Sequence, residues 1–214
     1  MKTITALLFA ALLPLSPAAH AQAQPADVSP EAMVRQITDD VLDAIKQDKA
    51  LQSGDKQKAL ALAEQKVLPH LDFVEMTRLA AGRAWNSATA DQRNRLVAAF
   101  RAMLVRTYAN AIDVYRGQTM MVEPSRVPVS ATEATVRNRY MSPGKRPTPV
   151  DYVMRKGADG WKIYDIVVDG ISLVLTYRSQ FEEAGRSAGL EGLIKQLQDK
   201  TQAQPVVRPG GTTS

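Results

Sequence analysis

The chain has 214 residues, of which 27 are Lys or Arg and 22 are Asp or Glu, so its formal net charge is +5. It contains no cysteine and two histidines, which excludes disulfide frameworks, thiolate nucleophiles, cysteine-based metal sites and histidine-rich metal sites. The positive charge is spread along the chain without a Lys/Arg block. This pattern favours solubility near anionic partners over sequence-specific binding of nucleic acid.

The first 21 residues have the pattern of a secretory signal peptide. Lys2 precedes a short apolar run from Ile4 to Leu15, and a small-residue Ala-His-Ala motif ends at Ala21. The apolar run is too short for a permanent membrane span. We therefore expect residues 1–21 to be cleaved, residues 22–29 to form a flexible lead-in, and the mature protein to lie outside the cytoplasm.

Helix signals dominate the first half of the mature chain. Ser29 followed by Pro30 predicts a helix start, and apolar residues then recur at helical spacing to Ile45. A second helix is expected at about 56–67, before Pro69. A short third helix is expected within residues 71–82, where Asp72 supplies an N-terminal cap and Gly82 ends the helix.

The longest predicted helix begins at Thr89–Gln92, which has the pattern of a capping box. Gly117 is expected to end it. One continuous apolar stripe runs along this helix. Its members are Val97, Phe100, Leu104, Tyr108, Ala111 or Ile112, and Tyr115.

The hydrophobic period then changes from helical to alternating. Strands are predicted at 119–123, 132–141, 148–156 and 161–169, and the tight turns between the last three indicate an antiparallel meander. Two helices should follow, at about 171–184 and 190–199. Residues 201–214 have linker composition and are expected to be a disordered tail. The predicted fold class is α+β, with a single folded domain over residues 30–200.

The alternation predicts one apolar sheet face, on which Asp165 falls together with Trp161 and Ile163. Two interpretations of this carboxylate remain open. It could be a general base whose pKa is raised by an apolar cavity, with Tyr140 or Tyr152 donating to an oxyanion. Alternatively, it could accept hydrogen bonds from backbone donors at the start of the next helix. The apolar face itself is either an ordinary core or the wall of a cavity.

Four segments of the chain resemble the MlaC (toluene-tolerance auxiliary) family, the periplasmic phospholipid carriers of Gram-negative bacteria. They are Leu71–Trp85, Asp91–Tyr115, Trp161–Phe181 and Gly189–Leu197. The resemblance implies a fold related to nuclear-transport-factor-2 domains, with a four-stranded sheet and an added N-terminal helical part that encloses an apolar cavity. It also implies that the ligand is a phospholipid, that there is no cofactor or metal, and that the protein is not an enzyme.

On this interpretation the apolar sheet face is the floor of the cavity. Its lid is the apolar stripe of the longest helix together with the start of the helix that follows the last strand. Arg83 and Arg178 are candidates for head-group binding or docking. The predicted cavity residues are Phe100, Leu104, Tyr108, Ile112, Met120, Val122, Val136, Tyr140, Val150, Tyr152, Met154, Trp161, Ile163, Leu173, Val174 and Tyr177.

The leading hypothesis is therefore a periplasmic carrier that moves phospholipid between the two membranes and maintains outer-membrane lipid asymmetry. We expect it to be a monomer. Its implied partners are an inner-membrane ABC transporter complex with a lipid-binding subunit and an outer-membrane lipoprotein–porin complex. Nucleic acid is not an expected partner. The alternatives are a small-molecule enzyme that uses Asp165 and a tyrosine, and a ligand-free adaptor of the cell envelope.

Overall fold

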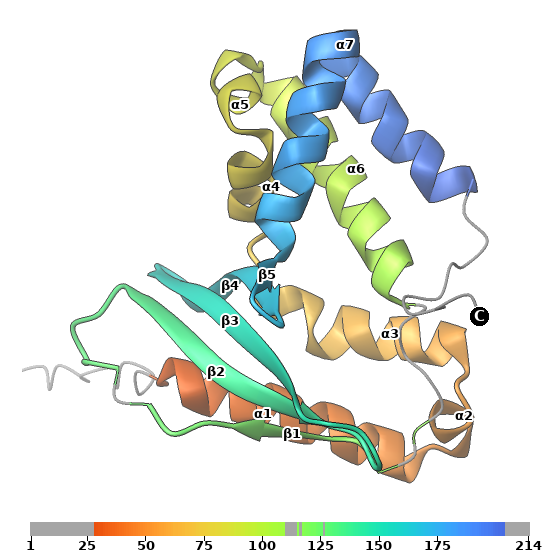
Figure 1. Cartoon of the computed structure of the whole chain (residues 1–214), viewed down its shortest axis with the longest axis vertical. Coiled ribbons are helices and arrows are strands. Elements are labelled where there is room, and N and C mark those ends of the chain that lie inside the picture. Colours follow the sequence, from red (N-terminus) through yellow and green to blue (C-terminus); the bar gives the residue numbers. More distant parts are fainter. Residues whose placement is uncertain (1–27, 110–114, 116, 126, 204–214) are drawn as a thin grey trace, which may run out of the picture.

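The computed structural model describes residues 28–109, 115, 117–125 and 127–203 (Figure 1). The predicted signal peptide, most of the lead-in and residues 204–214 of the predicted tail therefore lie outside the described residues, as does Ile112. The described chain forms two connected parts. A sheet with helix α1 lies at one end of the molecule, and helices α4, α6 and α7 lie at the other.

The N-terminal helices begin where local capping groups predict. Helix α1 (Pro30–Gln47) is capped by the Ser29 hydroxyl, which accepts from the Ala32 backbone N–H at 3.2 Å. Three shorter helices follow α1, namely α2 (Lys49–Gln52), α3 (Lys56–Lys66) and the 3₁₀ helix η1 (Leu68–His70). The side chains of Asp48 and Asp55 cap α2 and α3 in the same way.

Helices α4 and α6 also confirm their predicted caps. Asp72 accepts from the Glu75 N–H at 2.9 Å, and Gly82 ends the helix. The capping box is reciprocal: Thr89 Oγ1 accepts from the Gln92 N–H at 3.2 Å, and Gln92 Oε1 accepts from the Thr89 N–H at 3.0 Å. The elements are α4 (Phe73–Ala81), α5 (Arg83–Ser87) and α6 (Ala90–Ala109).

The sheet is an antiparallel meander in the order β1-β2-β3-β4-β5. Four strands match the prediction, and the fifth is a two-residue strand that pairs with Val167 and Val168. Asp169 and Gly170 connect β4 to β5 with positive φ angles of 50° and 81°, which is the conformation of a two-residue hairpin turn. The α+β fold class is confirmed. The strands are β1 (Thr119–Val122), β2 (Glu133–Met141), β3 (Thr148–Gly157), β4 (Gly160–Val168) and β5 (Ile171–Ser172).

Helix α7 (Leu173–Ala203) contains the two helices expected at the C-terminus. Gly189 interrupts its helical backbone with φ 66° and ψ −176°, so the chain changes direction between the two halves. The second half continues to Ala203. The predicted start of the tail at residue 201 was therefore too early.

A β-bulge in β4 overturns one prediction about the sheet faces. Val153 pairs with Asp165, whereas Met154 pairs with Ile163, so Tyr164 is the extra residue. An extra residue shifts the alternation by one position. Asp165 therefore lies on the face opposite Trp161 and Ile163, and not on their face as predicted.

The sheet and α1 enclose the first of two hydrophobic clusters. Val34 of α1 is 2% exposed and is buried against the inner sheet face, meaning the face that α1 covers. The sheet residues of this cluster are Val122, Val136, Met154, Trp161 and Ile163.

The second cluster lies among α4, α6 and α7. Phe100 of α6 is fully buried, and its ring centroid is 5.1 Å from that of Tyr177 and 5.0 Å from that of Phe181. The apolar stripe of α6 thus packs against α7 and α4. The prediction that α6 forms a lid over the sheet was wrong, because α1 occupies that position.

One ion-pair network ties the two parts together. Glu75 of α4 is 7% exposed, and its carboxylate accepts from Arg78 at 2.6 Å and from Arg155 of β3 at 2.8 Å. Arg155 also contacts Glu133 at 3.1 Å. These charge-assisted hydrogen bonds hold α4 against the strand.

Candidate functional site

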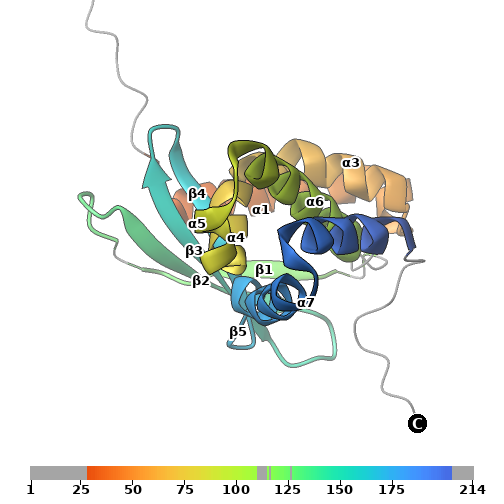
Figure 2. The same ribbon diagram turned by 90° about the horizontal axis from the view of Figure 1, so that it is seen from above.

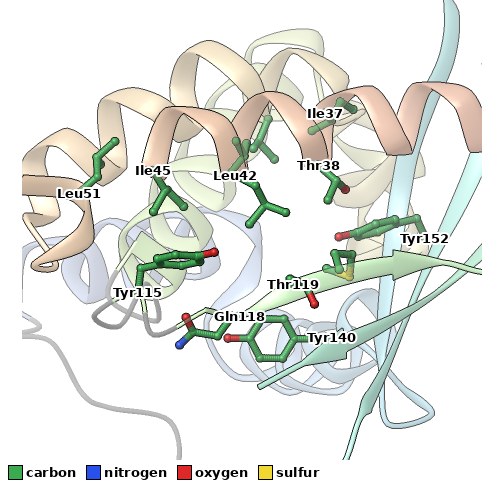
Figure 3. Close-up of a pocket in the computed structure, with 13 residues that line it drawn as sticks. Ile37, Thr38, Leu42, Ile45, Leu51, Tyr115, Gln118, Thr119, Tyr140 and Tyr152 are labelled. Carbon is green, nitrogen blue, oxygen red and sulfur yellow. The ribbon is translucent and has the colours of Figure 1, made fainter. Parts of the chain in front are cut away.

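An apolar pocket lies between α1 and the inner sheet face (Figure 3). Its volume of about 430 Å³ falls within the range of small-molecule sites in proteins. Figure 3 shows α1 along one side and strands β1 and β2 along the other. The lining residues are Ile37, Thr38, Val41, Leu42, Ile45, Leu51, Val67, Tyr115, Gln118, Thr119, Met120, Tyr140 and Tyr152.

Helix α1 makes the apolar wall of this pocket. Its apolar residues are buried against the sheet near the N-terminus of the helix and line the pocket farther along. Val34, near the N-terminus of the helix, is closed against the sheet. Farther along the same helix Ile37, Leu42 and Ile45 are only half-buried and line the pocket. The helix therefore anchors on the sheet at one end and leaves space under its other end.

Polar groups lie mainly on the sheet side of the pocket. Figure 3 shows Gln118, Thr119 and Tyr140 gathered on one side, and the Tyr152 hydroxyl pointing into the pocket. Burial raises the pKa of Tyr152, so this hydroxyl stays protonated at neutral pH. Among the described residues the Tyr152 hydroxyl has no hydrogen-bond partner, so it is available to a ligand.

A second polar group lies on the same sheet face, two residues along β2 from Tyr140. Asn138 is 1% exposed, and its amide N–H donates to the Val136 carbonyl at 2.9 Å. Its Oδ1 atom has no partner among the described residues. An apolar wall with a few polar groups opposite suits a ligand that is itself largely apolar with a polar end.

The structure distributes the predicted cavity residues over three places. Met120, Tyr140 and Tyr152 line the pocket. Val122, Val136, Met154, Trp161 and Ile163 belong to the closed cluster between the sheet and α1. Phe100, Leu104, Leu173, Val174 and Tyr177 belong to or pack against the helical cluster.

The remaining predicted residues are placed less centrally. Tyr108 is 45% exposed and is hydrogen-bonded to Tyr177. Val150 is half-buried on β3 opposite Asn138, and it is not among the residues that line the pocket. Ile112 lies outside the described residues.

The resemblance implied that an N-terminal helical part encloses the cavity, but none of the α1 residues that line the pocket was predicted. The signal was present, because Ile37, Val41 and Ile45 repeat at helical spacing and need an apolar partner. The helix was predicted, but its stripe was not assigned to the cavity. Leu51 of α2 and Val67 after α3 were missed as well, and no local pattern marks them as pocket residues.

Arg83 and Arg178 lie apart from this pocket. Both line a groove between α5 and α7, at the end of the helical part farthest from α1 and β1 (Figure 1). They are therefore not head-group ligands for a molecule held in the pocket beside α1.

Asp165 has a structural role. Its carboxylate accepts from the backbone N–H groups of Ile166 at 2.8 Å and Val174 at 3.1 Å, and from the Ser172 hydroxyl. It thereby caps the start of α7. Because the bulge also turns it away from the face that carries Tyr140 and Tyr152, the geometry gives the predicted acid–base pairing no support.

Two features are absent from the described part of the chain. No group of three or more His, Cys, Asp or Glu side chains is arranged to hold a metal ion there. None of the described helices is both long and apolar enough to cross a membrane.

Comparisons with known proteins identify the family. The model of the MlaC protein family matches residues 35–199. The intermembrane phospholipid transport system binding protein MlaC of Haemophilus influenzae is 22% identical over 185 residues, which is 85% of this chain and 86% of that protein. Toluene tolerance protein ttg2D of Pseudomonas putida is 28% identical over 102 residues, 48% of this chain and 47% of that protein.

A solved structure extends the similarity to three dimensions. The phospholipid-binding protein from Ralstonia solanacearum, determined in complex with a phospholipid, is 36% identical and superimposes with a TM-score of 0.74. The match covers 83% of this chain and 98% of that one. Since the family model spans most of the chain and the fold agrees, this protein belongs to the MlaC family.

Proposed function

We propose that this protein binds phospholipid in the pocket between α1 and the sheet and carries it through the periplasm between the outer and inner membranes. The observation that carries the proposal is the apolar pocket itself, in a chain whose relative from Ralstonia solanacearum was solved with a phospholipid. The name of the Haemophilus influenzae relative, which refers to intermembrane phospholipid transport, supports the same assignment.

The chemistry of the pocket suits acyl chains. Each buried methylene contributes about 0.8 kcal/mol, so ten methylenes against Ile37, Leu42 and Ile45 would contribute about 8 kcal/mol before the losses of binding. The hydroxyl of Tyr152, which points into the pocket, can donate to an ester oxygen of a glycerolipid. Tight binding of this kind requires a partner for release, because spontaneous escape would return the whole apolar area to water.

The wider assignment follows from the family. The expected partners are an inner-membrane ABC transporter complex with a lipid-binding subunit and an outer-membrane lipoprotein–porin complex, and the expected outcome is the maintenance of outer-membrane lipid asymmetry. The signal-peptide pattern of residues 1–21 supports a periplasmic location. The excess positive charge suits approach to anionic lipid surfaces.

Two tryptophan substitutions test the pocket against the closed core. Leu42→Trp should place an indole ring in the pocket, reduce co-purifying phospholipid and leave the melting temperature within a few degrees. Val136→Trp, in the fully buried cluster, should overpack and destabilise by about 1–3 kcal/mol. Organic extraction with mass spectrometry measures lipid, and thermal unfolding measures stability.

The same experiment separates the alternatives. A parent protein without phospholipid, together with a destabilised Leu42→Trp variant, would contradict the carrier proposal and favour a ligand-free adaptor. Turnover of a small molecule that disappears in an intact Asp165→Asn variant would favour an enzyme.

A further inference from the structure

A second concave site lies between α5 and α7, and its lining is cationic where the lipid pocket is apolar. Its volume is about 570 Å³. Three arginines line it, namely Arg83, Arg178 and Arg186, against one carboxylate, Glu182. Its floor includes the buried residues Ala81 and Phe181, which are each 3% exposed.

Two of these arginines have no carboxylate partner in the described part of the protein. Arg178 pairs with Glu182 at 3.1 Å, whereas Arg83 and Arg186 are exposed and have no hydrogen-bond or ion-pair partner among the described residues. Elsewhere the surface arginines Arg95 and Arg139 are paired with carboxylates. The groove therefore holds positive charge that an anionic partner can neutralise.

The backbone keeps this groove open at two positions. Gly82 has φ 55° and ψ −122°, a conformation that favours glycine, and it joins α4 to α5 so that Arg83 lies beside α7. Gly185 lies inside α7, and a Cβ atom built there would meet nothing within 4 Å. Since glycine weakens a helix interior relative to alanine, a side chain at this position would both suit the helix and fill the groove.

We propose that this groove docks an acidic segment of a partner protein, with carboxylates on Arg83 and Arg186 and a small apolar side chain above Phe181. Concavity favours a peptide segment over a flat membrane surface. The chain's own C-terminal residues 204–214 do not suit the groove, because they contain Arg208 and no Asp or Glu. Helix α5 and the adjoining part of α7 lie at the opposite end of the molecule from α1 and β1 (Figure 1), and Figure 2 views the molecule from this helical end. Docking there leaves the lipid pocket beside α1 accessible.

The proposal is tested with the full mature protein and a fluorescein-labelled acidic peptide, GEEALAEEG, against its basic counterpart GKKALAKKG. Fluorescence polarisation should detect the acidic peptide only, with affinity that falls as salt rises. The double variant Arg83→Glu/Arg186→Glu should weaken this binding by at least about tenfold. Lys56→Glu is the matched control, since Lys56 is exposed on α3, away from the groove, and should change it by less than about twofold.

Gly185→Glu provides an independent variant that is compatible with the helix. It should abolish peptide binding while the melting temperature stays at or above that of the parent. Equal weakening by Lys56→Glu would overturn the proposal, as would binding that survives both groove variants. A third outcome would also overturn it: the protein fails to bind the peptide but binds anionic phosphatidylglycerol vesicles in a way that requires Arg83 and Arg186. That result would assign the groove to a membrane surface. Phospholipid content, measured on the same preparations, reports separately on the carrier function.

Discussion

Asp165 joins three elements through a single carboxylate. Its oxygens accept from the N–H groups of Ile166 and Val174 and from the Ser172 hydroxyl, so it fixes β4, β5 and the first turn of α7 together. We expect Asp165→Ala to lower the free energy of unfolding by about 1–3 kcal/mol, because part-buried donors lose their acceptor. Asp165→Asn keeps one acceptor and should lower it less. Chemical denaturation of the two variants measures the difference, and equal stability of Asp165→Ala and the parent would contradict the capping role.

Glu75 predicts a pH dependence of stability. Its hydrogen bonds from Arg78, opposed by burial and assisted by Arg155, lower its pKa below the usual 4.5. A carboxyl group whose pKa is lower in the folded than in the unfolded state stabilises the fold above the unfolded pKa. That stabilisation is lost as the pH falls from about 4.5 through the folded pKa.

The matching substitution is Glu75→Gln. We expect it to destabilise by about 1–3 kcal/mol at pH 7, toward the lower end because both arginines still reach water. Urea unfolding between pH 3 and 7 should show that the difference between Glu75→Gln and the parent shrinks at acid pH. Glu183→Gln, on an exposed residue of α7, is the control. A constant difference across this pH range would exclude the proposed ion-pair network as its cause.

Helix α7 depends on its glycines in opposite ways. Gly189 has φ 66° and ψ −176°, a backbone region that is essentially restricted to glycine. We expect Gly189→Ala to lower stability by about 1–3 kcal/mol. Gly185→Ala, in helical conformation with open space around the new Cβ atom, should instead raise it by up to about 1 kcal/mol. Melting temperatures of the pair provide the check, and the same sign for both would contradict the break at Gly189.

Element boundaries were largely predictable because caps are local. Ser29, Asp72 and the Thr89–Gln92 capping box need only their own neighbours to act, and all three begin helices as expected. The bulge at Tyr164 was not predictable by counting alternate residues, because it is defined by the partner strand β3. That single extra residue reversed the face assigned to Asp165.

At the scale of the whole molecule, sequence patterns did not determine which helix covers the sheet. Both α1 and α6 carry apolar stripes, and an apolar stripe specifies only that it must be buried. The stripe of α6 contacts Phe181 and Tyr177 of α7, whereas α1 takes the sheet. Three predicted cavity residues, Met120, Tyr140 and Tyr152, nevertheless line the pocket, because strand alternation before the bulge was correct.

The position of the pocket also predicts that lipid contributes to the stability of the entire fold. Around the pocket α1 and the sheet do not contact each other, and a bound ligand would contact both. Removing the ligand therefore exposes Ile37, Leu42 and Met120 to water. A ligand at 100 times its dissociation constant stabilises the folded state by about 2.7 kcal/mol, which corresponds to roughly 5–10 °C for a domain of this size. We expect delipidation by organic solvent or detergent exchange to lower the melting temperature by that amount, and re-addition of phospholipid to restore it. Leu42→Trp protein should respond less to the same treatment, since its indole ring occupies part of the pocket and it carries less lipid to lose. If parent and variant respond alike, or if the parent does not respond, the bound lipid is not held between α1 and the sheet.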